Sequence, residues 1–350
     1  MPLAVGPRRF LSPPGGGAGF RQCHAASLVL LPDGSLLAAF FAGTKEGAPD
    51  TAIWTARRGG DSWQPPRRAI AEPGVAHWNP VLHVDGDRLL LFHKTGPTVH
   101  DWTTSLAVST DTGASWSAPR PLVAGDATPR GPAKNKLLAA WDGAWLGPGS
   151  IEDANHWDAF IDRSTDRGET WTLAPIPLTH RTPAAPGAGL WQGLEAGALW
   201  ENDPARAFAW DGVIQPTLWE SAPGTIHALM RSTRGTVHRS DSTDGGRTWS
   251  AAYPTRLPNN NSGLDLARLA DGTLVLACNP VAGNWRARTP LALLLSADNG
   301  ETWRQEAVLE DEDGEFSYPA LITTQDGTGL HIAYTWNRRA IVHRAAAAGS

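Results

Sequence analysis

An eight-residue pattern that occurs four times in the 350-residue chain constrains its fold more than any other feature. The pattern is Ser-x-Asp-x-Gly-x-x-Trp, and its copies begin at Ser109, Ser164, Ser242 and Ser296. In a hairpin turn the Ser and Asp side chains bond backbone N–H groups, glycine adopts a positive φ, and the Trp ring packs between neighbouring sheets. A fifth copy, which ends at Trp63, retains only the glycine and the tryptophan. Copies this similar indicate a repeat protein.

The spacing of the copies predicts which kind of repeat the chain contains. The tryptophans of neighbouring copies are 53 to 55 residues apart, except for a gap of 78 residues between Trp171 and Trp249. A strand-rich unit of about 40–50 residues is typical of one four-stranded blade of a β-propeller. Five copies and a sixth unit without one predict an all-β, six-bladed β-propeller with four-stranded antiparallel blades. Residues 1–350 are expected to form this single domain, with N-terminal residues supplying the outer strand of the last blade.

The long gap between Trp171 and Trp249 predicts an insertion at residues 179–211. This segment is rich in Ala, Gly and Pro and contains three tryptophans. An inserted loop on a propeller face can form part of a pocket, as a lid or a wall, or it can be a surface excursion without a role in a pocket. The sequence leaves these two alternatives open.

Composition excludes several classes of protein. The net charge of −5 gives no support for a nucleic-acid or anionic membrane partner. We see no apolar run long enough for a signal peptide or a membrane span, so we expect a cytoplasmic protein. Cys23 and Cys278 lie in apolar strand-like runs and are predicted to be buried free thiols. No spacing of His, Cys, Asp or Glu is typical of a metal site, and no cofactor fingerprint is present. We therefore expect no metal and no cofactor.

The propeller geometry predicts which residues surround the central axis on one face. They lie where inner strands begin and in the loops that leave the second strands. The polar residues at these positions are His24, Lys45, Glu46, Asp50, His77, Asn79, Lys94, Lys134, Lys136, Glu152, Gln215, Arg231, Asn259, Asn261, Asp265, Arg288 and Tyr318. Cations outnumber anions in this set, which predicts a pocket for an acidic small molecule or an acidic sugar.

The repeated turns resemble the Asp-boxes of the sialidase (neuraminidase) superfamily, and the resemblance extends over nearly the whole chain. Similar chains are known as sialidase-like or BNR-repeat proteins. The resemblance implies that Arg231, in Leu-Met-Arg-Ser, and Arg288, before Thr-Pro-Leu, are the second and third arginines of a carboxylate-binding triad. It also implies that Tyr318, in Ser-Tyr-Pro-Ala-Leu, is the nucleophile, and that the loop with Glu46 and Asp50 carries the general acid.

Two positions depart from the family pattern. The first arginine of the triad falls on His24, and the glutamate that activates the tyrosine falls on Gln215. A neutral amide cannot accept the phenol proton, so Tyr318 needs another base, for which His24 and Glu315 are the candidates.

Three functions follow from this set of residues. The first is an exo-glycosidase that releases a terminal sialic acid or related acidic sugar from a glycoconjugate, with Glu46 (or Asp50) as the proton donor. The second is a lyase that cleaves a uronic acid by β-elimination, with His24 or Tyr318 as the base and the cations stabilising the intermediate. The third is a non-catalytic propeller that binds an acidic glycan. In each, the remaining polar residues of the central set are predicted to contact the substrate.

Overall fold

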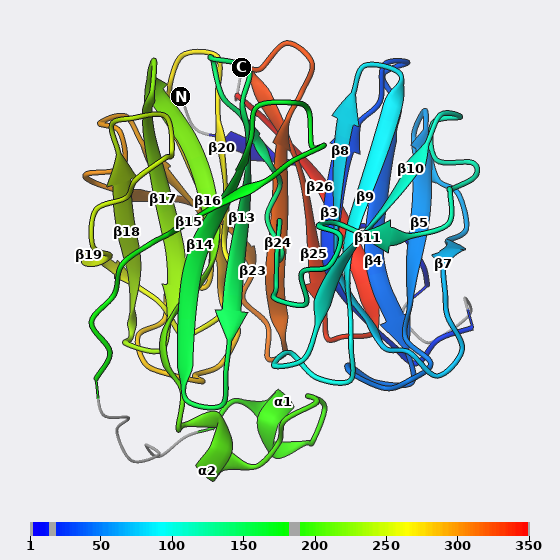
Figure 1. Ribbon diagram of the computed structural model, residues 1–350, viewed down its shortest axis with the longest axis horizontal. Coiled ribbons are helices and arrows are strands. Elements are labelled where there is room, and N and C mark those ends of the chain that lie inside the picture. Colours follow the sequence, from blue (N-terminus) through cyan, green and yellow to red (C-terminus); the bar gives the residue numbers. More distant parts are fainter. Residues whose placement is uncertain (1–2, 14–18, 182–189, 349–350) are drawn as a thin grey trace.

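The computed structural model describes residues 3–13, 19–181 and 190–348, and within them the fold is all-β with almost no helix. Figure 1 shows the strands running side by side, with two short helices beyond one end of them. These helices are α1 (Gln192–Glu195) and α2 (Pro204–Ala207). No helix in these ranges is long and apolar enough to cross a membrane.

The strands form five hydrogen-bonded sheets. One contains β3 (Gln22–Leu30), β4 (Leu36–Gly43), β5 (Ala52–Gly59), β6 (Ser62–Trp63) and β7 (Arg67–Ile70). The next contains β8 (His77–Asp85), β9 (Arg88–Thr95), β10 (Thr103–Ser109) and β11 (Arg120–Pro121). A third contains β20 (Asp265–Arg268), β21 (Leu274–Cys278), β22 (Leu291–Ser296) and β23 (Arg304–Glu310). Strands that follow each other in the chain pair antiparallel in all three, as predicted, except that β7 pairs with β5 and not with β6.

The largest sheet consists of two antiparallel halves. The first half is β12 (Leu138–Ala139), β13 (Trp145–Glu152), β14 (His156–Ser164) and β15 (Thr172–Pro175). The second is β16 (Asp211–Ala222), β17 (Thr225–Ser232), β18 (Thr236–Ser242) and β19 (Tyr253–Pro258). A parallel pairing of only two residues joins β14 to β16. Glycine is required there, because a Cβ on Gly212 would lie 1.9 Å from the carbonyl oxygen of Trp157.

The last sheet joins the two ends of the chain. It contains β24 (Phe316–Thr323), β25 (Gly329–Trp336) and β26 (Ala340–Ala348). Strands β1 (Leu3–Val5) and β2 (Arg9–Phe10) both pair with β26. The prediction that N-terminal residues supply the outer strand of this unit is confirmed.

The four Ser-x-Asp-x-Gly-x-x-Trp segments form the same turn. In the first, the backbone N–H of Gly113 donates to Ser109 Oγ at 2.8 Å, and the N–H of Ser115 donates to Asp111 Oδ1 at 2.9 Å. The other three copies repeat both bonds. Gly113 has a φ of 88°, which explains why glycine is used at this position. The sequence pattern therefore encodes the turn through its own hydrogen bonds.

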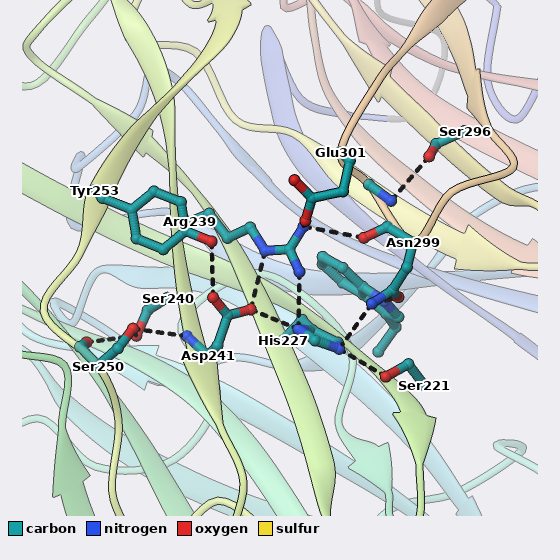
Figure 2. A network of polar contacts seen from close by, with 12 residues as sticks. Ser221, His227, Arg239, Ser240, Asp241, Ser250, Tyr253, Ser296, Asn299 and Glu301 are labelled. Atoms are coloured by element: carbon teal, nitrogen blue, oxygen red, sulfur yellow. Dashed lines mark hydrogen bonds and ion pairs between the residues drawn. The ribbon is translucent and has the colours of Figure 1, made fainter.

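Arginines on third strands attach these turns to the preceding group of strands. Arg57 on β5 donates to the Thr112 hydroxyl at 2.9 Å, and Arg163 on β14 donates to the Gly245 carbonyl at 2.9 Å. Arg239 on β18 donates in the same way to the Asn299 carbonyl, as part of the network in Figure 2. Polar contacts as well as apolar packing thus hold neighbouring groups together.

A bulge interrupts four of the inner strands near their first residues. In β3, β8, β16 and β24 one extra residue lies opposite the partner strand. The residue in a left-handed conformation at each bulge is Ala25 (φ 54°), Asn79 (φ 34°), Gln215 (φ 55°) or Tyr318 (φ 53°). Such a conformation costs a non-glycine residue about 1–2 kcal/mol. Bulges redirect side chains, and strain of this kind is concentrated at functional sites.

The two cysteines are buried and free, as predicted. Burial raises the pKa of the Cys278 thiol to about 12 and that of Cys23 further, so both remain protonated at neutral pH.

Candidate functional site

Side chains from widely separated parts of the chain line one small cavity of about 40 Å³. Seven of the predicted site residues take part, namely Glu46, Asn79, Glu152, Gln215, Arg231, Arg288 and Tyr318. The rest of the lining includes Arg338, Glu201 and the tryptophans Trp78, Trp102, Trp157, Trp200, Trp210 and Trp285. Three of the four bulge residues are in this lining, so the strained backbone positions direct side chains into the cavity.

Arg231, near the end of β17, is a buried cation that is hydrogen-bonded only to neutral groups. Its Nη1 donates to the Tyr318 hydroxyl at 2.6 Å and to Gln215 Oε1 at 3.3 Å. Its Nε donates to Asn261 Oδ1 at 3.0 Å, and its Nη2 donates to the Asn261 carbonyl. No carboxylate of the described residues lies within 4.0 Å of this guanidinium, which is 2% exposed. Because a buried unpaired charge is costly, this arrangement favours an anionic ligand beside Arg231.

Arg288 and Arg338 share the carboxylate of Glu315. Arg288 Nη1 lies 2.9 Å from Glu315 Oε1, and Arg338 Nε lies 2.9 Å from Oε2. Arg338 Nη1 also pairs with Glu46 at 2.6 Å, but its Nη2 is buried without a partner. Burial lowers the pKa of Arg288 to about 10. Burial also opposes the charged form of Arg338, but the neighbouring carboxylates of Glu315 and Glu46 outweigh it and raise the pKa of Arg338. Both side chains are therefore cations at neutral pH.

Sequence analysis did not identify Arg338. It lies in the turn between β25 and β26, with a φ of 53°. In the sequence Asn-Arg-Arg it has the composition of an ordinary solvated hairpin turn. Only the pairing of the strands shows that this turn faces the cavity.

Tyr318 and His24 lie in ring contact, with centroids 4.1 Å apart. The Tyr318 oxygen accepts a hydrogen bond from Arg231, and Gln215 Nε2 lies 3.5 Å from it. Donation from a guanidinium stabilises negative charge on a phenol oxygen. Neither ring nitrogen of His24 has a partner. Burial, reinforced by Arg338 and Arg288, lowers the pKa of His24 well below its ordinary value, so the imidazole is neutral.

Two glutamates of the lining, Glu152 on β13 and Glu46 in the loop after β4, have different partners. Burial raises the pKa of Glu152, the last residue of β13, to about 7. Its Oε1 accepts only a 3.2 Å hydrogen bond, from Ser150. Glu46, in contrast, is paired with Arg338 at 2.6 Å. Glu152 is thus the better proton donor near neutral pH.

Residues 190–211 of the insertion cover the cavity; residues 182–189 lie outside the described ranges. Trp210 stacks on Trp157 with centroids 5.1 Å apart, and Trp285 Nε1 donates to the Ala207 carbonyl at 3.1 Å. A Cβ on Gly47 would lie 2.8 Å from Trp200, so the loop after β4 also contacts the insertion closely. Of the two alternatives for this segment, the structure shows a pocket wall.

Lys94 on β9 and Lys134 and Lys136 in the segment before β12 lie outside the cavity lining, in contrast to our expectation. Lys94 donates to the Thr104 hydroxyl at 2.6 Å and to the Arg130 carbonyl at 2.7 Å. Lys134 donates to the Leu264 carbonyl at 3.0 Å. Lys136 pairs with Asp265 at 2.9 Å. Each of these lysines is therefore bound to an acceptor within the protein. Asp265, another predicted site residue, is the partner of Lys136 and also lies outside the cavity lining.

Four other predicted residues have different surroundings. His77 accepts a hydrogen bond from the backbone of Glu72 and is buried away from the cavity. Asp50 is exposed and accepts from the Thr44 hydroxyl at 2.6 Å. Lys45 is exposed and lines a neighbouring groove, whereas Asn261 positions Arg231.

The charge balance of the cavity also differs from the expectation. Its lining holds three arginines and three glutamates, so cations do not outnumber anions. However, Glu46 is paired with Arg338, Glu201 is paired with Arg206 at 3.0 Å, and the raised pKa of Glu152 favours its neutral form. Arg231 therefore remains as the unpaired cation within the described lining.

Comparisons with known proteins agree with the fold and the repeated turns. A BNR repeat-like domain model matches residues 34–332, and the chain belongs to this family. Its fold is that of the sialidases. A Hadza microbial sialidase superposes with a TM-score of 0.73 at 19% identity, over 97% of this chain and 68% of that one. A Trypanosoma rangeli sialidase in complex with sialic acid has a TM-score of 0.66 at 16% identity, over 94% and 54%.

Two other relatives show how broad this resemblance is. A protein of unknown function from Dyadobacter fermentans has a TM-score of 0.75 at 15% identity, over 99% of both chains. A xyloglucanase from a Paenibacillus species is 26% identical over 233 residues, which are 52% of this chain. The chain spans only 22% of the length of that xyloglucanase.

Proposed function

We propose that the chain is a glycosidase that removes a terminal acidic sugar in the cavity described above, on a single six-bladed propeller formed by residues 1–350. The observation that carries this proposal is that Arg231, Arg288, Arg338 and Tyr318 meet in one tryptophan-lined cavity. Sialidase and xyloglucanase relatives support activity on glycans.

The arginines would bind the carboxylate of the sugar. Arg231 has no acidic partner in the described chain, and Arg338 Nη2 is a buried donor without an acceptor. A planar guanidinium matches the two oxygens of a carboxylate. Tryptophan rings around the site provide apolar surfaces for the faces of the sugar ring.

Tyr318 and Glu152 would carry out the bond cleavage. Tyr318 gives its phenol proton to the adjacent neutral imidazole of His24, and its oxygen, which accepts a hydrogen bond from Arg231, attacks the anomeric carbon while Glu152 donates its proton to the leaving oxygen. The glycosidic bond breaks and a tyrosyl–sugar intermediate forms. Water then attacks the same carbon, Glu152 takes the water proton, and the tyrosine oxygen leaves and recovers its proton from His24. Tyrosine nucleophiles are an accepted exception to the two-carboxylate mechanism.

Tyr318→Phe tests this proposal directly. We expect the variant to lose at least about 10³-fold of the rate of release from fluorogenic sialosides and uronides. Tyr253→Phe, which also removes a phenol hydroxyl but lies in the network of Figure 2, is the matched control. Equal rates for wild type and Tyr318→Phe would exclude Tyr318 as the nucleophile.

The neutral imidazole of His24 favours a second candidate, a uronic-acid lyase. The unprotonated ring nitrogen of this imidazole has no hydrogen-bond donor among the described residues, the ring contacts Tyr318, and Gln215 cannot activate that tyrosine. An arginine-bound uronate carboxylate would stabilise the enolate-like intermediate of β-elimination. An unsaturated product that absorbs in the ultraviolet identifies the lyase, whereas binding of an acidic glycan without any product identifies a non-catalytic protein.

A further inference from the structure

A groove of about 1040 Å³ lies beside the cavity. Arg338 lines both, and Lys45 of the groove precedes Glu46 of the cavity in the chain. Residues 192–193 and 196–198, in and just after α1, line the groove, and residues 199–201 line the cavity. A ligand bound at Arg338 can therefore extend from one space into the other.

The groove is basic although the whole chain has a net charge of −5. Its lining contains four cationic side chains, Arg21, Lys45, Arg338 and Arg339, and one carboxylate, Glu315. Arg21, Lys45 and Arg339 are exposed. Over the described ranges, none of these three has a carboxylate within 4.0 Å. A concave surface with one sign of charge attracts ligands of the opposite sign.

The difference in size between the two spaces points to the role of the groove. A cavity of about 40 Å³ accommodates only a small part of a glycan, whereas ligand pockets usually measure about 300–1,000 Å³. The buried Nη2 of Arg338 has no partner, and Arg338 belongs to both linings. The donors available to a ligand thus continue from the cavity into the groove.

We propose that the groove binds the remainder of the substrate beyond the scissile bond and that this remainder is an anionic oligosaccharide. This inference rests on the function proposed above and specifies the substrate class. Carboxylate groups of uronic acids and sulfate esters share the chemistry that the three exposed cations would recognise.

The test compares two triple variants that change the charge equally. The groove variant is Arg21→Gln, Lys45→Gln and Arg339→Gln; the control is Arg67→Gln, Arg120→Gln and Arg256→Gln, all exposed on outer strands. Turnover is measured with uronic-acid, sulfated and neutral oligosaccharides and with a fluorogenic monosaccharide. We expect the groove variant to raise KM for the anionic oligosaccharides about tenfold and to reduce its salt dependence. The control variant should leave KM unchanged, and the relative KM values of the uronic-acid and sulfated substrates identify the anion.

Calorimetric binding to Tyr318→Phe separates this inference from the proposed reaction. Anionic oligosaccharides that bind this variant, and bind more weakly when the groove changes are added, support the groove even if wild type shows no turnover. Turnover of the monosaccharide together with equal KM values for anionic and neutral oligosaccharides would overturn the groove proposal and leave the glycosidase intact.

Discussion

Two buried arginines only eight positions apart have opposite surroundings. Arg231 on β17 is 2% exposed and Arg239 on β18 is 4% exposed. Arg239 pairs with Asp241 at 2.9 Å and with Glu301 at 3.1 Å, and it donates to the Asn299 carbonyl (Figure 2). Among the residues that the structure describes, Arg231 hydrogen-bonds only to neutral groups, and it lines a cavity. Burial alone therefore does not identify a functional arginine; the missing carboxylate does.

The network around Arg239 contains an arrangement that resembles a catalytic triad. Ser221 Oγ lies 2.7 Å from His227 Nε2, and His227 Nδ1 lies 2.5 Å from Asp241 (Figure 2). Asn299 Nδ2 also lies 3.1 Å from His227 Nε2, and Asp241 accepts from Tyr253 and Arg239 as well. Although burial opposes ionisation, these donors lower the pKa of Asp241. The network is saturated with protein partners, so we interpret it as structural.

Arg231→Met should have the largest effect on activity. We expect kcat/KM for an acidic fluorogenic sugar to fall about 10³-fold, because the unpaired cation and the donor to Tyr318 are both lost. Thermal unfolding should change little, since no buried carboxylate loses its partner. If Arg231→Met instead lost much stability and kept its activity, Arg231 would be the structural arginine, contrary to our interpretation.

Arg239→Met should have the opposite profile. It removes the buried guanidinium that pairs with Asp241 and Glu301 and contacts His227, and we expect a loss of about 3 kcal/mol in the free energy of unfolding. Activity per folded molecule should stay within about twofold. Denaturant titration and kinetics on the same preparation measure both quantities, and an unchanged midpoint would contradict the structural interpretation.

Glu152 should make stability depend on pH. Its folded-state pKa of about 7 is above the ordinary 4.5, so the folded state holds the proton more tightly than the unfolded state. The resulting stability is fully present below about pH 4.5 and is lost as pH rises through 7. We expect wild type to lose at least about 2 kcal/mol relative to Glu152→Gln over this interval. If the free energy of unfolding of wild type and of Glu152→Gln depended on pH in the same way, Glu152 would not have a raised pKa in the folded state.

Asp50→Asn should have the smallest effect. The carboxylate is exposed and only accepts bonds from Thr44, so we expect less than about 1 kcal/mol of destabilisation. The rate should stay within about twofold of wild type. A large fall in kcat, with recovery on substrates that have a good leaving group, would return the role of general acid to this residue.

The sequence predicted the repeated turn and the all-β fold because each turn is held by its own Ser, Asp and Gly. It also predicted that Arg231, Arg288 and Tyr318 lie together, because the repeat indicates which strand ends are neighbours, and these three residues do line one cavity. The surroundings of Lys94 and Lys134 could not be predicted. Lys94 lies on β9, where successive side chains point to opposite faces, so a position at a strand end does not by itself say which face the side chain takes. Lys134 lies before β12, outside any strand, so no strand periodicity determines its direction.

The bulges have a consequence for how such a site can change. Residues 79, 215 and 318 reach the cavity from backbone that has left the regular strand ladder, so a new side chain there need not alter sheet pairing. The same scaffold can then acquire a new specificity through a few replacements. Chains with only 15–19% identity to this one share its architecture, so architecture alone does not identify the ligand of any one of them.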